Sequence, residues 1–255
     1  MIKRQIPNII TLANLLCGVL ASFSAAIGDI SFAALLICLG IFFDFFDGMA
    51  ARLLGVASPL GKELDSLADV VTSGVAPGLI LFSILSEGGG PLVRFFSLTA
   101  FLVPLFAAYR LAKFNLDTRQ SHSFLGLPVP ANALIWVGLA LYLVPLGSCD
   151  CELCIAEGEF ECNPLLTNNV FLTALIIISL ITDILMVSEL PMFSLKFNFK
   201  DMSWKTNAVQ YLFLLVCVAI VAICFATHIF WLSISFIILW YILLSILTRK
   251  HSNAH

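Results

Sequence analysis

Long apolar runs separated by short polar breaks constrain the fold of this chain more than any other feature of its sequence. A helix needs about 20 mostly apolar residues to cross the roughly 30 Å hydrocarbon core of a bilayer. The chain is 60% hydrophobic and 11% charged, whereas soluble domains average about 45–50% and about 25%, which excludes a soluble enzyme. About eight spans are predicted, over residues 9–27, 31–53, 60–86, 92–112, 127–146, 169–189, 207–226 and 230–248.

The runs predict an all-α polytopic membrane protein. They lack the two-residue alternation of a transmembrane β-barrel strand, as the stretch 209–227 illustrates, and helices are the other structure that satisfies its backbone inside lipid. The first run is expected to be a retained helix, because it is longer than the apolar segment of a typical signal peptide.

The basic residues predict that both termini are cytoplasmic, because cytoplasmic loops carry an excess of Lys and Arg. With Lys3 and Arg4 inside, eight spans place every one of the 13 Lys and Arg residues on that side except Arg94. Such an arrangement fits an inner or cell membrane of a prokaryote. The net charge of −3 gives no sign of a nucleic-acid partner, and the basic and aromatic residues of 193–205 predict contact with membrane lipids.

An outer loop over about residues 147–168 is acidic and rich in cysteine. Four thiols on a short loop in an oxidising compartment favour two disulfides, and a metal site is the alternative. The residues concerned are Cys149, Cys151, Cys154 and Cys162.

Four aspartates stand at the predicted cytoplasmic ends of the second and third spans. Asp44 and Asp47 are three residues apart, and Asp65 and Asp69 are four apart, so each pair shares one face of a helix. Charges inside spans are costly and therefore point to function. Clustered carboxylates repel one another unless cations offset them, and hard oxygen ligands suit Mg²⁺, Mn²⁺ or Ca²⁺. The alternative is that these are solvated charges at helix ends.

The full pattern, Asp-x2-Asp-Gly-x2-Ala-Arg-x8-Gly-x3-Asp-x3-Asp over residues 44–69, resembles the signature of the CDP-alcohol phosphotransferases, with no departure. The resemblance implies a membrane enzyme that cleaves a CDP-linked substrate, releases CMP and uses Mg²⁺ or Mn²⁺, with two divalent ions. It implies metal binding by Asp44, Asp47, Asp65 and Asp69, with Asp69 as general base. It also implies CDP binding by Asp47, Gly48, Ala51, Arg52 and Gly61, and a homodimer.

Three further stretches resemble the integral-membrane phosphatidylserine synthases within this family: residues 7–18, 110–130 and 186–197. This resemblance implies transfer of the phosphatidyl group of CDP-diacylglycerol to the hydroxyl of L-serine at a cytoplasmic active site. Arg110, Lys113 and Asn115 are predicted to bind serine or a lipid phosphate. The chain is then one transmembrane domain, residues 1–255, with catalytic helices over about 5–190 and a C-terminal helix pair over about 205–248.

Two alternatives stay open at this point. A phosphatidylglycerophosphate or phosphatidylinositol-phosphate synthase would need more cations for a phosphorylated acceptor, which Arg110, Lys113 and Arg119 could supply. A cation transporter would predict acids spread across the bilayer depth, whereas these acids lie near one face. Asp183, inside the sixth predicted span, is a candidate for recognising an ammonium group or for a hydrogen bond between helices.

Overall fold

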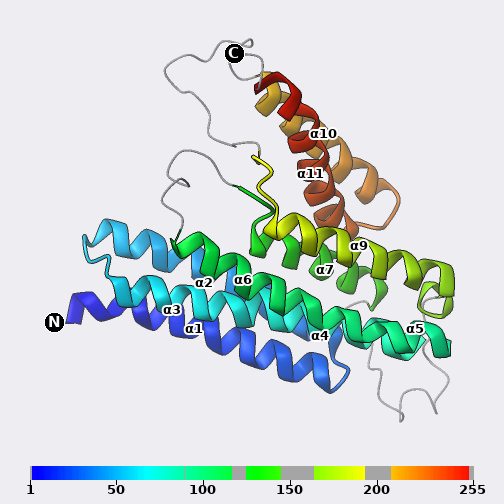
Figure 1. Ribbon diagram of the computed structural model, residues 1–255, viewed down its shortest axis with the longest axis horizontal. Helices are drawn as coiled ribbons and strands as arrows, with labels where there is room; N and C mark the ends of the chain where they lie inside the picture. The colour runs from blue at the N-terminus through cyan, green and yellow to red at the C-terminus, as the bar shows by residue number, and fades with distance from the viewer. Residues whose placement is uncertain (1, 89, 117–124, 145–163, 193–207, 253–255) are drawn as a thin grey trace.

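The computed structural model describes residues 2–88, 90–116, 125–144, 164–192 and 208–252 (Figure 1). Six helices are long and apolar enough to cross a membrane, and two shorter apolar helices bring the described total to the expected eight. The prediction of an all-α polytopic membrane protein is confirmed. The cysteine loop, Arg119 and the basic segment 193–205 lie outside the described residues, and the side chains of Lys3 and Arg4 are also not described.

The elements follow the predicted runs closely. The first two spans are α1 (Ile2–Ala26) and α2 (Ile30–Leu53). The third joins α3 (Pro59–Asp69), the π-helical turn η1 (Val70–Val75) and α4 (Ala76–Gly88). The fourth joins α5 (Pro91–Phe96), the 3₁₀ turn η2 (Ser97–Phe101) and α6 (Leu102–Leu116). The others are α7 (Val129–Leu143), α9 (Asn169–Val187) with the 3₁₀ turn η4 (Pro164–Thr167) before it, α10 (Ala208–Ala226) and α11 (Leu232–Ser252).

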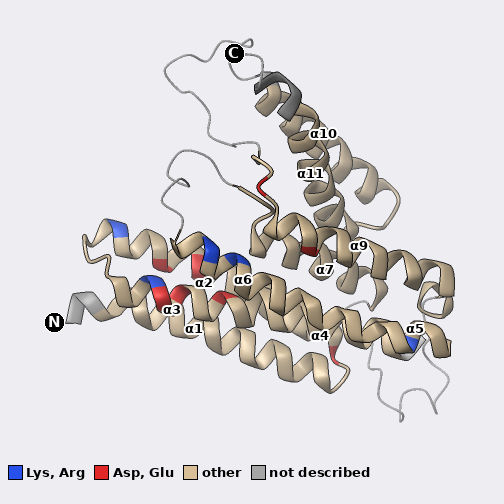
Figure 2. Cartoon of the chain, viewed as in Figure 1, with Lys and Arg blue, Asp and Glu red and all other residues tan. Residues whose placement is uncertain are grey.

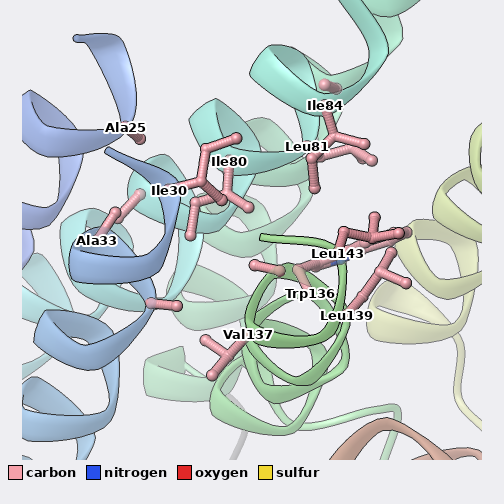
Figure 3. Packing of buried hydrophobic residues seen from close by; sticks show 14 of the residues in the cluster. Ala25, Ile30, Ala33, Ile80, Leu81, Ile84, Trp136, Val137, Leu139 and Leu143 are labelled. Atoms are coloured by element: carbon pink, nitrogen blue, oxygen red, sulfur yellow. The ribbon is translucent and has the colours of Figure 1, made fainter. Parts of the chain in front are cut away.

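The centre of the bundle is an apolar cluster around α7. Trp136, Leu139 and Leu143 of α7 face Ile80 and Ile84 of α4 in the core (Figure 3). All of these side chains are buried, and Trp136 is among the largest that are fully buried. Because lipid tails are as apolar as these side chains, close packing rather than escape from water holds such helices together.

Small residues let α1, α2 and η1 approach closely. A Cβ added at Gly18 would lie 2.8 Å from backbone atoms of Thr72, and one added at Gly40 would strike the Thr72 side chain. A larger side chain at either position would therefore push the third span away from the first two. This contact lies directly beside the C-terminal end of α3, where the last of the four aspartates is placed.

A short connection fixes the start of α7 against the end of α9. Gly126 has φ +73° and a Cβ there would meet the carbonyl oxygen of Met186 at 2.6 Å, so glycine is required on both counts. The Gly126 amide donates to Leu190 O and the Leu127 amide to Leu185 O, at 2.9 and 3.0 Å. The connection and the end of α9 thereby lie beside Arg110 and Lys113 of α6, although they are far from them in the sequence.

Candidate active site

The turn between α2 and α3 brings the two aspartate pairs together. Gly55 follows α2 with φ +62°, a conformation that favours glycine. Ser58 caps α3 by accepting a hydrogen bond from the Gly61 amide at 3.1 Å, and Pro59 occupies the first helical turn. These features stop one helix and start the next within a few residues, so α3 turns back toward the aspartates of α2 and both helices pack against α1.

Three of the four aspartates converge. Asp44 and Asp47 of α2 and Asp65 of α3 each offer an oxygen, and these oxygens lie within 4.8 Å of one another. Asp65 Oδ1 is buried and has no hydrogen-bond partner among the described residues. A buried carboxylate oxygen without a donor is costly, and hard oxygen ligands fit a divalent cation. The cluster could therefore hold a metal ion.

Asp69 lies one helical turn beyond Asp65 and is 8% exposed. It does not belong to the group of three, although its charge acts on Asp44 and Asp65. Its Oδ1 accepts a hydrogen bond from Asn14 Nδ2 at 3.4 Å. Asp69 is thus close to the cluster of Asp44, Asp47 and Asp65, but its carboxylate is held by a hydrogen bond from Asn14.

Helix α1 braces both acid pairs, a role that the sequence argument did not assign. Thr11 donates a hydrogen bond to Asp47, and Asn14 donates to Asp69. Asn14 is fully buried, and its backbone carbonyl accepts a hydrogen bond from Thr72 Oγ1 at 3.1 Å. The sequence did contain a sign of this role: Thr11 and Asn14 are polar residues three apart in an apolar span, where polar groups need hydrogen-bond partners.

A cavity of about 230 Å³ opens beside the aspartates, between α1, α2 and α3. It brings together every residue that the resemblance associates with CDP: Asp47, Gly48, Ala51, Arg52 and Gly61 line it. Asn8, Thr11, Ser58 and Lys62 also line it and were not predicted.

The two glycines of this cavity differ in how tightly they are constrained. A Cβ at Gly61 would lie 3.3 Å from both Asn8 Oδ1 and Ser58 Oγ, whereas one at Gly48 would make only an ordinary 3.7 Å contact with Arg52. Arg52 Nε donates to the Gly48 carbonyl at 2.9 Å. The arginine is therefore tied to its own helix and faces the cavity rather than neutralising the aspartates.

The three residues predicted to bind the acceptor are placed differently from one another. Arg110 is 8% exposed, its charge acts on Asp69, and its guanidinium carbon lies 5.9 Å from the ring centre of Phe114. Lys113 instead pairs with Glu189 at 3.2 Å. Asn115 Nδ2 donates to Ser66 Oγ at 2.8 Å, and its carbonyl accepts from Lys62 Nζ at 3.2 Å. Of these three residues, Arg110 is the one whose charge acts on an aspartate of the site.

Charge is segregated along the bundle. Most of the acidic and basic ribbon of α2, α3 and α6 gathers at one end of these helices, and little lies at the other end (Figure 2). A membrane transport path would need acids through the bilayer depth. The charged residues of these helices instead gather at one end of the bundle.

Asp183 of α9 is the exception. It is 1% exposed, and neither carboxylate oxygen has a hydrogen-bond partner among the described residues. Ser179, one turn earlier, is also buried. The structure does not bring Asp183 into the cluster of Asp44, Asp47 and Asp65.

The comparison with family models decides the relationship, because the model for the CDP-alcohol phosphatidyltransferases matches residues 4–178. The chain belongs to this family. A CDP-diacylglycerol–serine O-phosphatidyltransferase of Bacillus subtilis is 39% identical over 148 residues, which cover 56% of this chain and 82% of that protein. One of Helicobacter pylori is 32% identical over 216 residues, 83% of this chain and 78% of its own. One of Saccharomyces cerevisiae is 40% identical over 113 residues, 41% and 39% of the two chains.

For a CDP-alcohol phosphatidyltransferase, the matched region has a clear structural meaning. It contains α1 to α7, and with them the aspartates, the cavity and Arg110. It ends inside α9, so α10 and α11 lie beyond it. The protein is a transferase of phospholipid synthesis embedded in a membrane, and the contribution of its last two helices is not explained by the family match.

Proposed function

We propose that the protein transfers the phosphatidyl group of CDP-diacylglycerol to the hydroxyl of L-serine, giving phosphatidylserine and CMP. The observation that carries the proposal is the convergence of Asp44, Asp47 and Asp65 beside the cavity that the rest of the motif lines. The relatives that bear the name CDP-diacylglycerol–serine O-phosphatidyltransferase support the choice of substrates.

In this reaction the serine oxygen forms a bond to the phosphorus that carries diacylglycerol, and the bond from that phosphorus to CMP breaks. The nucleotide would occupy the cavity between α1, α2 and α3, where Gly61 leaves room for the backbone to approach it. Arg52 and Lys62 would provide positive charge along the diphosphate.

Asp44, Asp47 and Asp65 would hold divalent ions, Mg²⁺ or Mn²⁺, with Asp69 as a ligand of the second ion. Bound there, such ions would stabilise the negative charge that develops on the phosphate oxygens and on the departing CMP. Thr11 fixes the Asp47 carboxylate by a hydrogen bond and so sets part of the ligand geometry in advance.

Asp69 would accept the proton of the serine hydroxyl. It is buried, and Asn14 restricts its rotation by donating to one oxygen. A base held in one orientation beside the acceptor avoids the entropic cost of finding that orientation during each turnover.

Arg110 would bind an anionic group of the acceptor complex, the serine carboxylate or a lipid phosphate. Its Nε is buried without a hydrogen-bond partner, and no carboxylate oxygen of the described chain lies within ion-pairing distance of it. A buried guanidinium with an open donor is suited to bind a planar anion. Lys113 and Asn115 would support the site from its rim.

The choice of serine over a phosphorylated alcohol rests on charge. A phosphate on the acceptor would favour several free cations near Arg110, yet Lys113 is already paired with Glu189. We also propose that the site faces the cytoplasm of a prokaryotic cell and that the protein is a homodimer. The distribution of basic residues in the sequence supports the orientation.

The test is CMP release by the purified protein in detergent with CDP-diacylglycerol and Mg²⁺ or Mn²⁺. Serine, glycerol 3-phosphate, inositol and inositol 1-phosphate are supplied side by side, with Asp65→Asn as the inactive control. We expect release only with serine and only with a divalent ion. Release with glycerol 3-phosphate and not with serine would reassign the acceptor, and no release with any alcohol would contradict the enzymatic proposal.

A further inference from the structure

The C-terminal helix pair α10–α11 reaches the acceptor side of the site. The pair projects away from the other helices, and α11 returns to pack across α7 (Figure 1). Ser235 Oγ donates to the Ile135 carbonyl at 2.7 Å, and a Cβ added at Gly138 would lie 3.0 Å from the Ser235 amide. This close contact anchors α11 to a helix at the centre of the bundle.

From that anchor, α11 reaches a buried apolar cluster that it shares with α6. Ile242 belongs to this cluster with Ala107 and Leu111 of α6, and Ile238 and Tyr241 pack against it. Ala107 and Leu111 are the residues on either side of Arg110 along one face of α6. The C-terminal helix therefore shares its packing with the part of α6 that carries the arginine assigned to the acceptor by the proposed function.

Tyr241 is the polar residue of this face. Tyr241 lies close enough to Arg110 for the guanidinium charge to act on its phenol group, and Arg110 also lies close enough to Asp69 for their opposite charges to attract. Phe114 contacts the guanidinium from α6 itself. The Tyr241 ring packs edge-on against Phe213 of α10, with ring centres 6.2 Å apart, so both helices of the pair hold the tyrosine in place.

An arginine needs such support to act as a binding group. Its long side chain loses much of its rotamer freedom when it is fixed on a ligand. A guanidinium has five N–H donors and no acceptor, whereas a phenol oxygen can accept a hydrogen bond. A tyrosine fixed beside Arg110 can thus orient the guanidinium before the anion arrives and leave the remaining donors for that anion.

We propose that Tyr241 is a positioning residue for Arg110, and that α10–α11 thereby completes the acceptor side of the active site. The inference rests on the proposed function, since it assumes that Arg110 binds the acceptor complex. Its consequence is that a helix beyond the family-model match contributes to the affinity for serine, while the nucleotide side of the site does not depend on it.

A double-mutant cycle tests the proposal on the full-length protein. The variants are Tyr241→Phe, which removes only the hydroxyl, Arg110→Lys, and the two combined. Tyr109→Phe is the matched control, because it is the same change on the neighbour of Arg110 at a position that is 60% exposed. The measured quantities are kcat, the KM for serine and the KM for CDP-diacylglycerol, from CMP release, with kcat/KM from initial slopes where serine does not saturate.

We expect Tyr241→Phe to raise the serine KM about five- to tenfold, the effect of losing one polar contact. We expect kcat and the KM for CDP-diacylglycerol to change less than about twofold, and Tyr109→Phe to have no effect. In the Arg110→Lys background, Tyr241→Phe should add almost nothing, because the two residues act as one unit.

Two outcomes would overturn the proposal. One is an unchanged serine KM in Tyr241→Phe, or a fall of kcat alone, which is the sign of a merely structural residue. The other is an undiminished effect of Tyr241→Phe in the Arg110→Lys background. Failure of the proposed function is distinguishable from both, because the unmodified protein would then release no CMP with serine.

Discussion

The nucleotide side and the acceptor side of this site are built in different ways. The nucleotide side takes its residues from α1, α2 and α3, which are consecutive in the chain and joined by tight turns. The acceptor side takes Arg110 from α6 and surrounds it with residues of α9 and α11, more than 70 positions further along. The first side depends on local structure, and the second depends on how distant helices pack.

This difference predicts that the two sides can be damaged separately. Changes on α1 to α3 should affect kcat/KM for CDP-diacylglycerol or the concentration of divalent ions that the reaction requires. Changes around Arg110 should affect the KM for serine. Asp69 is expected to be the exception, because it is near both the aspartate cluster and Arg110.

The largest effect is expected from Asp69→Asn. The amide keeps the shape of the side chain and its contact with Asn14, but it removes the base, so kcat should fall at least about 10³-fold. Binding of CDP-diacylglycerol, measured by calorimetry in detergent, should stay within a few fold of the unmodified protein. Loss of binding that matches the loss of rate would refute the assignment of Asp69 as base.

Arg110→Lys should have the next largest effect and should be confined to the acceptor side. Lysine keeps the charge but presents a point charge rather than a fork, so the serine KM should rise about ten- to a hundredfold, the range for one charge-assisted hydrogen bond. The KM for CDP-diacylglycerol should not change. Arg94→Lys, on the exposed surface of α5, is the control, and an equal rise in both KM values of Arg110→Lys would show that the two sides are not separable.

Thr11→Val should produce a smaller effect on the other side. The substitution removes the hydroxyl that donates to Asp47 and keeps the volume of the side chain. We expect about a tenfold loss in kcat/KM for CDP-diacylglycerol and a higher requirement for Mg²⁺ or Mn²⁺, because a hydrogen bond to a charged carboxylate contributes about 1.5 kcal/mol or more. The serine KM should not move. Thr99→Val in η2 is the control, because it likewise removes a hydroxyl that donates a hydrogen bond, there to the Phe96 carbonyl.

The sequence predicted the aspartates and glycines that α2 and α3 bring to the cavity, but not the residues of α1, for a physical reason. Span lengths follow from apolar runs, and a fixed spacing such as that of Asp44 and Asp47 determines which residues share a helix face. The cap at Ser58 and the left-handed glycine at Gly55 are local features of the same kind, because they act on their immediate neighbours. Local rules of this kind need no knowledge of tertiary packing.

The acceptor side could be predicted only in part. Arg110, Lys113 and Asn115 were predicted together from their position at the end of a span, with lysine the weaker candidate because it presents a point charge. In the structure, Lys113 and Asn115 are engaged by Glu189 and Ser66. Nothing near Tyr241 in the sequence indicates that it lies near Arg110. That proximity depends on the path of α11 across α7, and residues about 130 apart carry no local signal of it.

The smallest effect, and the sharpest contrast with Arg110, is expected from Lys113→Gln. Its side chain is 36% exposed and that of Glu189 is 61% exposed, and exposed ion pairs contribute about 0–1 kcal/mol. The serine KM should therefore change less than about twofold, and Glu189→Gln should behave in the same way. A tenfold rise in the serine KM for Lys113→Gln alone would place Lys113 on the ligand, and with a second cation there a phosphorylated acceptor would have to be reconsidered.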